Sequence, residues 1–215
     1  MRCLYCDKEL GQGSLRDIFI GEDPLCYACR KKWQKEPIHF LLEGIEVDAD
    51  YLYEEAFSSC LIQYKECYDE AFKDAFLFEV KKKLRRRYRG YTLCMMPSSQ
   101  HKYEERGFSH LYEMFRCIGL PILEPFVKAS DISQKGKGKK NRMDMKDAIR
   151  CTQSLPEKIV LCDDTITTGA TLCGALSQID RQKHKIRIYC VSANRKWYDK
   201  LQEQNFEKCP KCSIR

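Results

Sequence analysis

The sequence predicts an α/β protein with a small metal-binding ribbon at its N-terminus. Short apolar runs alternate with stretches of helical periodicity, and two Cys-x-x-Cys pairs stand within the first thirty residues. A chain of 215 residues has room for one α/β domain and a small appendage. We therefore expect a ribbon over residues 1–33, a hairpin or connecting segment over 34–59, and the α/β domain over 60–215.

The N-terminal unit is defined by two cysteine pairs separated by nineteen residues. A single pair fits coincidence or a redox pair, but two pairs at this spacing supply the tetrahedral thiolate set of a zinc site. The expected ligands are Cys3, Cys6, Cys26 and Cys29. Because protein would fill all four positions, we expect the zinc to be structural. A third pair is formed by Cys209 and Cys212. The chain has no fourth pair that would complete a second metal site, which favours an unbound thiol pair.

The remaining cysteines bear on the compartment in which the protein works. The chain has fourteen cysteines, but its N-terminal sequence MRCLYCDKEL lacks the apolar core of a signal peptide. No stretch is long and apolar enough for a membrane span. We therefore expect a cytoplasmic protein without membrane insertion, in which the scattered cysteines inside apolar runs, such as Cys94, Cys162 and Cys190, are small core residues.

The segments after the ribbon follow in the order expected of a parallel sheet. Residues 34–59 are acidic and aromatic with partial alternation, which indicates a hairpin or an irregular connection. From Cys60 to Gly90 the apolar residues recur at helical spacing and the last turn is basic, which predicts one or two helices. Buried strands are expected at Tyr91–Met96, Lys158–Cys162 and Ile186–Val191, with helices over 107–119 and 169–182. Ligands of such sheets bind at the carboxyl ends of the strands.

One of these strand ends carries the segment VLCDDTITTGAT, from Val160 to Thr171. The loop after the strand is rich in threonine and glycine and leads into a helix start, where free backbone N–H groups favour a phosphate. The adjacent carboxylates of Asp163 and Asp164 point to different sides of an extended chain and suit vicinal sugar hydroxyls. A ribose 5-phosphate satisfies both demands.

This segment resembles the fingerprint of the type I phosphoribosyltransferases, which bind phosphoribosyl pyrophosphate. The resemblance implies a phosphoribosyltransferase-like parallel sheet, ribose contacts from Asp163 and Asp164, and magnesium bound to the diphosphate of the ligand. It also implies a 5-phosphate site lined by Thr165, Thr167, Thr168, Gly169 and Thr171.

Nearly the whole chain resembles the ComF family of late-competence proteins. The resemblance rests on the four-Cys ribbon and on the segments MPSSQHKYEERGFSH (96–110) and ISQKGKGKKNRMDMKDAI (132–149). It implies a pyrophosphate-loop region containing Pro97, Ser98, Ser99 and Arg106. The chain departs from the family pattern at Ser109-His110, where Asn-Gln is common, and at Met145, where Asn is common.

The family resemblance implies a role in natural transformation, in which the protein assists single-stranded DNA together with a ComFA-like helicase or ATPase. It would work in the cytoplasm, recruited to the inner face of the membrane by the DNA-uptake machinery. The net charge of +7 and the basic runs suit such a polyanion. The candidate DNA-binding residues are Lys82, Lys83, Arg85, Arg86, Arg87, Lys137, Lys139, Lys140 and Arg142. Solvated helix faces explain such runs about equally well.

An alternative function is an active phosphoribosyltransferase, a glycosyltransferase that acts on a nucleobase or another small nucleophile. Such an enzyme needs a hood that reads the edge of the base, and the N-terminal appendage that would form it is taken up by zinc. No catalytic residue is assigned, because a lone histidine such as His101, His110 or His184 is more often a surface or packed residue. The accessory DNA-handling function is therefore favoured.

Overall fold

The computed structural model describes residues 1–10, 22–129 and 149–199. Its main feature in the described chain is a six-stranded sheet with the order β1-β2-β8-β7-β3-β4, in which only the β1–β2 pair is antiparallel. The strands are β1 (Lys35–Leu42), β2 (Ile45–Leu52), β8 (Lys185–Ala193), β7 (Lys158–Ile166), β3 (Thr92–Met95) and β4 (Ile122–Leu123). The predicted α/β class, with a mostly parallel sheet, is confirmed.

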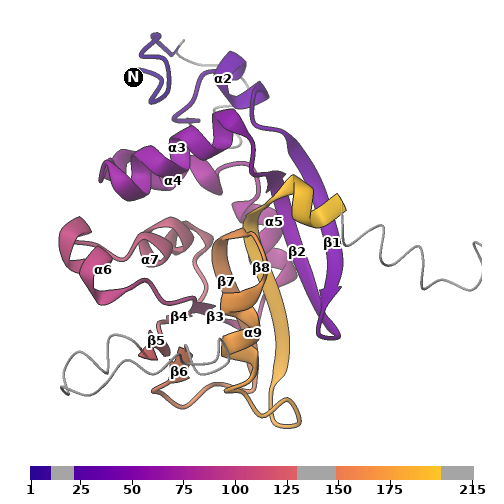
Figure 1. Ribbon diagram of the computed structural model, residues 1–215. Helices are drawn as coiled ribbons and strands as arrows, with labels where there is room; N and C mark the ends of the chain where they lie inside the picture. Colours follow the sequence, from indigo (N-terminus) through magenta and orange to yellow (C-terminus); the bar gives the residue numbers. More distant parts are fainter. Residues whose placement is uncertain (11–21, 130–148, 200–215) are drawn as a thin grey trace, which may run out of the picture.

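Helices flank this sheet (Figure 1). They are α2 (Tyr27–Lys31), α3 (Glu55–Glu66), η1 (Glu70–Phe72), α4 (Lys73–Phe76), α5 (Lys81–Arg87), α6 (Gln100–Arg106), α7 (His110–Phe115), η2 (Arg116–Ile118) and α9 (Ala170–Leu176). A small antiparallel pair, β5 (Phe126–Lys128) and β6 (Ile149–Cys151), lies beside the main sheet. Tyr189 of β8 is in ring contact with Tyr88, just after α5, and with Phe115 of α7.

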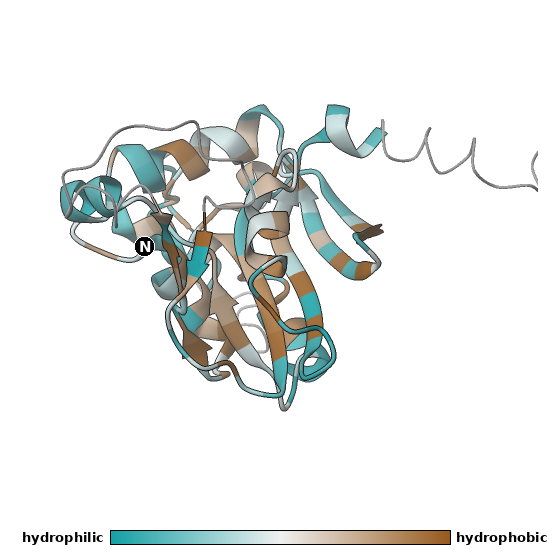
Figure 2. Ribbon diagram, turned by 60° about the horizontal axis from the view of Figure 1, so that its bottom comes forward, coloured by the Kyte–Doolittle hydropathy of each residue, from teal (hydrophilic) through white to brown (hydrophobic). Residues whose placement is uncertain are grey.

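The β1–β2 hairpin belongs to the main sheet, because β2 pairs in parallel with β8 from Val47 to Leu52. Figure 2 shows hydrophobic and hydrophilic residues alternating along this hairpin. Buried and exposed side chains alternate in β1 from Ile38 to Leu41, as expected for a strand with one buried face, whereas the second half of β2 is buried throughout. Residues 34–59 thus contain the hairpin and the first turn of α3. The division of the chain into three independent units stays a prediction.

The N-terminal region and the sheet share one hydrophobic core. Trp33 is 3% exposed and lies in ring contact with Tyr51, Phe57 and Phe76, at centroid distances of 5.6, 4.9 and 5.5 Å. The guanidinium of Arg30 stacks over Trp33 and donates hydrogen bonds to the carboxylate of Asp23 and to a backbone carbonyl in α4. The four-Cys region is therefore packed against helices α3 and α4.

The predicted strand at Lys158–Cys162 extends four residues further, to Ile166. Parallel pairing with β8 continues as far as Ile166 and Ala193, and the Thr165 and Ser192 hydroxyls are 2.8 Å apart across it. Asp163 and Asp164 consequently lie within the strand. This extension fixes the directions in which the two carboxylates point.

Candidate ligand-binding cavity and four-cysteine site

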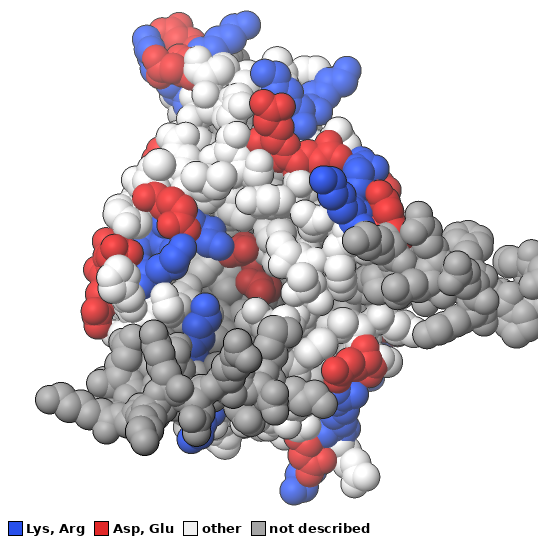
Figure 3. Space-filling view, viewed as in Figure 1, with Lys and Arg blue, Asp and Glu red and all other residues white. Residues whose placement is uncertain are grey.

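A cavity of about 380 Å³ opens at the carboxyl ends of β3 and β7. Its lining combines acids, lysines and hydroxyl groups: Tyr53, Leu61, Lys65, Met96, Pro97, Ser98, Ser99, Lys102, Arg106, His110, Leu111, Lys128, Asp163, Asp164, Thr165, Thr167 and Thr171. In Figure 3, basic side chains border a hollow with acidic side chains at its floor. This is the edge of the sheet at which parallel α/β proteins bind ligands.

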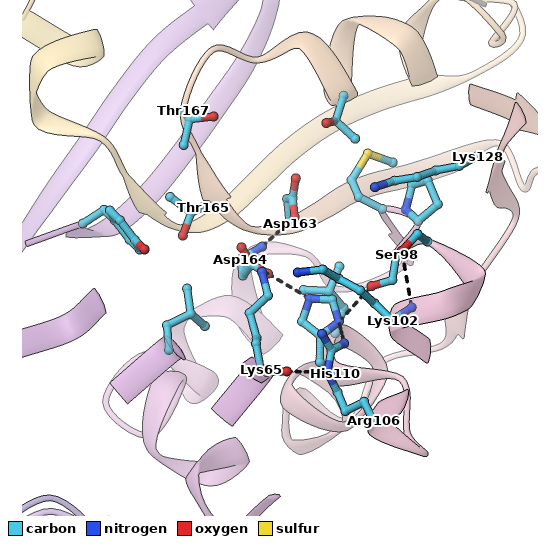
Figure 4. Close-up of a pocket in the computed structure, with 17 residues that line it drawn as sticks. Lys65, Ser98, Lys102, Arg106, His110, Lys128, Asp163, Asp164, Thr165 and Thr167 are labelled. Atoms are coloured by element: carbon cyan, nitrogen blue, oxygen red, sulfur yellow. Dashed lines mark hydrogen bonds and ion pairs between the residues drawn. The ribbon is translucent and has the colours of Figure 1, made fainter. Parts of the chain in front are cut away.

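The two adjacent acids point in different directions, as their positions on an extended strand require (Figure 4). Asp164 is 6% exposed, and its Oδ2 accepts hydrogen bonds from Lys65 Nζ and from His110 Nε2, each at 2.8 Å. Burial disfavours the charged form, but the Lys65 ammonium and the His110 hydrogen bond outweigh it and hold the pKa of Asp164 well below its usual range. Asp164 is therefore ionised and paired.

Asp163 has a different environment. Its Oδ1 accepts the backbone N–H of Asp164 at 2.9 Å, and among the described residues no side chain donates a hydrogen bond to it. Burial and the neighbouring charge of Asp164 raise the pKa of Asp163 from 3.8 to about 7. Asp163 is thus the acid of the pair that remains available to a ligand.

The threonine-rich loop contributes three of its predicted residues to the cavity: Thr165, Thr167 and Thr171. Thr168 and Gly169 lie outside the cavity lining. The Thr168 hydroxyl accepts the backbone N–H of Ala170, and Gly169 has a φ of +73° just before α9. A Cβ at Gly169 would lie 3.2 Å from a methyl group of Leu42, so this turn requires glycine and is packed against the hairpin.

The predicted pyrophosphate-loop residues Pro97, Ser98, Ser99 and Arg106 also line this cavity. The Ser99 hydroxyl accepts the Lys102 N–H at the start of α6, and Arg106 Nε donates to the backbone carbonyl of Lys65 at 3.0 Å. The cavity therefore unites the two segments that sequence analysis singled out, although they are more than fifty residues apart.

Sequence reasoning missed the lysines of this cavity. Lys65 comes from α3, Lys102 from α6 and Lys128 from β5, so that only the tertiary fold brings them together. Lys102 also pairs with Glu66 at 2.8 Å, whereas Lys128 pairs with no acid in the described part of the chain. His110, which sequence analysis left unassigned, is buried and hydrogen-bonded to Asp164.

The basic run on α5 is partly neutralised by acids of β2. Lys83 Nζ lies 2.6 Å from Asp50, and Arg87 lies 2.7 Å from Asp48. Arg85 and Arg86 remain exposed on this helix, as does Lys82, which has interactions of its own. The other DNA-binding candidates, Lys137, Lys139, Lys140 and Arg142, lie outside the described residues, as do Cys209 and Cys212.

The four N-terminal cysteines form a cluster in which all the sulfur atoms lie within 4.8 Å of one another: Cys3, Cys6, Cys26 and Cys29. The Cys6 and Cys26 sulfurs are 3.8 Å apart, the separation expected of two thiolates on a tetrahedral zinc ion with Zn–S bonds of about 2.3 Å. The backbone N–H of Cys26 also donates to Cys3 Sγ at 3.2 Å. The cluster can hold a metal ion, and its donor set fits zinc.

No helix in the described residues combines the length and the apolar character needed to cross a bilayer.

Comparisons with known proteins identify two similar competence proteins. The chain is 25% identical to "Competence protein ComFC" of Bacillus subtilis, with 79% of this chain and 85% of that protein aligned. It is 26% identical to "Competence protein ComFC" of Streptococcus pneumoniae, with 79% of this chain and 77% of that protein aligned. No family model matches the chain.

Proposed function

We propose that the protein acts in natural transformation, where it handles incoming single-stranded DNA and binds phosphoribosyl pyrophosphate. The two similarities support its assignment to the ComFC family. The observation that carries the ligand proposal is the cavity at the ends of β3 and β7. It places a free carboxylate, three threonine hydroxyls and three lysines around about 380 Å³. A phosphorylated sugar with a diphosphate group presents hydroxyls to the acid and anionic oxygens to the lysines.

In this proposal, magnesium enters with the diphosphate and the four-Cys cluster holds a structural zinc. Thr165, Thr167 and Thr171 surround the 5-phosphate, and Lys102 and Lys128 reach the diphosphate together with the loop around Ser98. The protein works in the cytoplasm, at the inner membrane face, where a ComFA-like helicase delivers the DNA.

The DNA-binding surface is proposed to include the basic run from Lys137 to Arg142 and the exposed arginines of α5. Cations already paired with acids contribute less, because binding a phosphate then requires breaking an ion pair. Lys83 and Arg87 are paired in this way, which makes them internal controls. Single-strand affinity should fall steeply with salt, because each phosphate contact releases counterions.

Fluorescence anisotropy of a labelled single-stranded oligonucleotide tests the DNA proposal across a salt series. We expect the quadruple alanine variant of Lys137, Lys139, Lys140 and Arg142 to lower the slope of log affinity against log salt by up to about 3, since each contact contributes about 0.7. Replacing Lys83 and Arg87 with methionine should change the slope little. Absence of binding by the zinc-loaded wild type at low salt would contradict the proposal.

Calorimetry tests the sugar-phosphate proposal separately. Phosphoribosyl pyrophosphate with magnesium should bind to the wild type, and ribose 5-phosphate should bind more weakly because it lacks the diphosphate. Repeating the anisotropy titration with the saturated protein shows whether the two ligands affect each other. No heat of binding for either sugar phosphate would contradict this part of the proposal.

A second candidate function is phosphoribosyl transfer, which one observation favours. A second cavity of about 260 Å³ adjoins the first across Pro97 and Ser98. Its walls combine apolar groups, such as Met95 and Phe126, with polar ones, such as Glu124. A planar acceptor fits such a mixed lining. Release of pyrophosphate when a panel of nucleobases is added would favour this function over a purely accessory one.

A further inference from the structure

We propose that the two adjacent acids have different roles: Asp164 is a positioning residue whose Oδ2 is held by Lys65 and His110, and Asp163 is the carboxyl group that receives the sugar hydroxyls. This inference rests on the proposed sugar-phosphate function for its ligand. It departs from the expectation that both acids contact the ribose, and it assigns roles to Lys65, Arg106 and His110 that the sequence motif does not contain.

The first step is the protonation state of His110, which its hydrogen bonds define. Arg106 Nη1 lies 2.9 Å from His110 Nδ1, and a guanidinium only donates hydrogen bonds. Nδ1 is therefore an acceptor without a proton, and the ring proton sits on Nε2. That nitrogen lies 2.8 Å from Asp164 Oδ2, so a neutral imidazole donates to the carboxylate. Burial in the same network lowers the pKa of His110, in agreement with the neutral form.

The second step is the rigidity of this network. Arg106, His110 and Asp164 are each at most 6% exposed, and they come from α6, α7 and β7. Arg106 Nε donates to the Lys65 carbonyl at 3.0 Å, while Lys65 Nζ donates to Asp164 at 2.8 Å. The network thus closes on itself through α3. A ligand hydroxyl that engaged Asp164 Oδ2 would have to displace one of two charge-assisted hydrogen bonds, the buried one from His110 or the partly buried one from Lys65.

The third step is the contrast with Asp163. In the described residues its carboxylate accepts only the backbone N–H that follows it, and Figure 4 shows it pointing away from Lys65 and His110. Lys128 and Thr171 line the cavity together with it. A carboxyl group with unused acceptor capacity accepts hydrogen bonds from vicinal hydroxyls. The geometry therefore assigns this contact to Asp163.

The network also predicts which replacement of His110 is tolerated. A glutamine amide offers one hydrogen-bond acceptor, its oxygen, and one donor group, its nitrogen. A neutral imidazole likewise offers one acceptor nitrogen and one donor nitrogen. H110Q can accept from Arg106 and donate to Asp164, whereas H110L can do neither. The pair of variants separates the hydrogen-bonding role of this side chain from its bulk.

The experiment compares D163N, D164N, H110Q and H110L in the zinc-loaded full-length protein by thermal unfolding and by calorimetry with phosphoribosyl pyrophosphate and magnesium. We expect D164N and H110L to lower the unfolding midpoint clearly and H110Q to stay near the wild type. D164N removes the negative charge that pairs with the Lys65 ammonium, and H110L leaves the buried Arg106 Nη1 donor without its acceptor. D163N should not lower the midpoint, yet it should weaken ligand binding by at least about tenfold. Nitrogen NMR of the imidazole should show Nδ1 unprotonated near neutral pH.

Several results would overturn the inference. A midpoint for D164N equal to that of D163N, or for H110L equal to that of H110Q, would show that the network does not position Asp164. Wild-type affinity in D163N would contradict the role of Asp163 in ligand binding. A charged imidazole would contradict the proposed role of His110. If the wild type itself binds no sugar phosphate, the proposed function and the role of Asp163 fail together, while the unfolding series still decides the role of Asp164.

Discussion

Replacing Asp163 with asparagine should make the protein more stable at alkaline pH and change it little at acidic pH. Asp163 is half-buried beside the ionised Asp164, and together they raise its pKa to about 7. An unfolded chain ionises this group near 3.8, so folding in between requires the carboxyl to take up a proton. The group's contribution to stability is therefore fully present below about pH 4 and is lost as the pH rises to about 7.

The size of the effect follows from the same two values. Each pKa unit corresponds to about 1.4 kcal/mol, so a change from 3.8 to about 7 lowers the free energy of unfolding above pH 7 by at most about 4 kcal/mol. Between pH 5 and pH 8, about 2–3 kcal/mol of this loss remains to be observed. Water in the open cavity screens these charges and reduces the free-energy difference. We expect about 2 kcal/mol.

Urea unfolding of the wild type and D163N at pH 5, 6, 7 and 8 measures this effect. Proton uptake by the zinc ligands and by His110 affects both proteins alike, so it cancels in the difference between their free energies of unfolding. This difference should grow in favour of D163N as the pH rises. A difference that stays constant from pH 5 to pH 8, or that changes sign in the other direction, would refute the reasoning.

Three further changes have expected outcomes. W33A should lower the free energy of unfolding by about 3–5 kcal/mol in a urea titration, because Trp33 fills the centre of an aromatic cluster. W33F should lower it by clearly less. A loss below about 1 kcal/mol for W33A would contradict this packing. G169A should lower the free energy of unfolding by about 1–2 kcal/mol and weaken sugar-phosphate binding in calorimetry. Adding L42A to G169A should relieve only the steric contact, since φ at residue 169 stays positive. Zinc chelation should release one equivalent of metal to a colorimetric dye and lower the unfolding midpoint, and C29S should be equally unstable with or without the chelator.

The sequence was a good guide to the fold class and to the two segments around the cavity. Apolar runs identified β3, β7 and β8, because strands buried on both faces leave a continuous apolar signal. The same signal placed the end of β7 too early, at Cys162, because charged residues interrupt it. The strand continues past them because its last residues pair with β8 and end at a ligand cavity, where polar side chains are accommodated.

The cationic residues show what local patterns cannot reveal. Lys83 and Arg87 look like free cations in their own helix, and only the fold places Asp50 and Asp48 opposite them. Lys65 belongs to an ordinary amphipathic helix and gives no local sign that its ammonium meets Asp164, ninety-nine residues away. Pairings at such separations depend on topology, and a periodicity of two or 3.6 residues contains no information about them.

The aromatic cluster around Trp33 has a consequence for the evolution of the N-terminal region and the sheet. A small zinc-bound unit folds largely on the free energy of metal binding, so such a unit can fold without support from its neighbours. Here the tryptophan that follows the cysteines packs between Tyr51 of β2, Phe57 of α3 and Phe76 of α4. A recombinant that acquired a different ribbon would leave this site empty and its α/β domain weakened. We therefore expect the two regions to descend together, so that a gene tree drawn from either one has the same branching order.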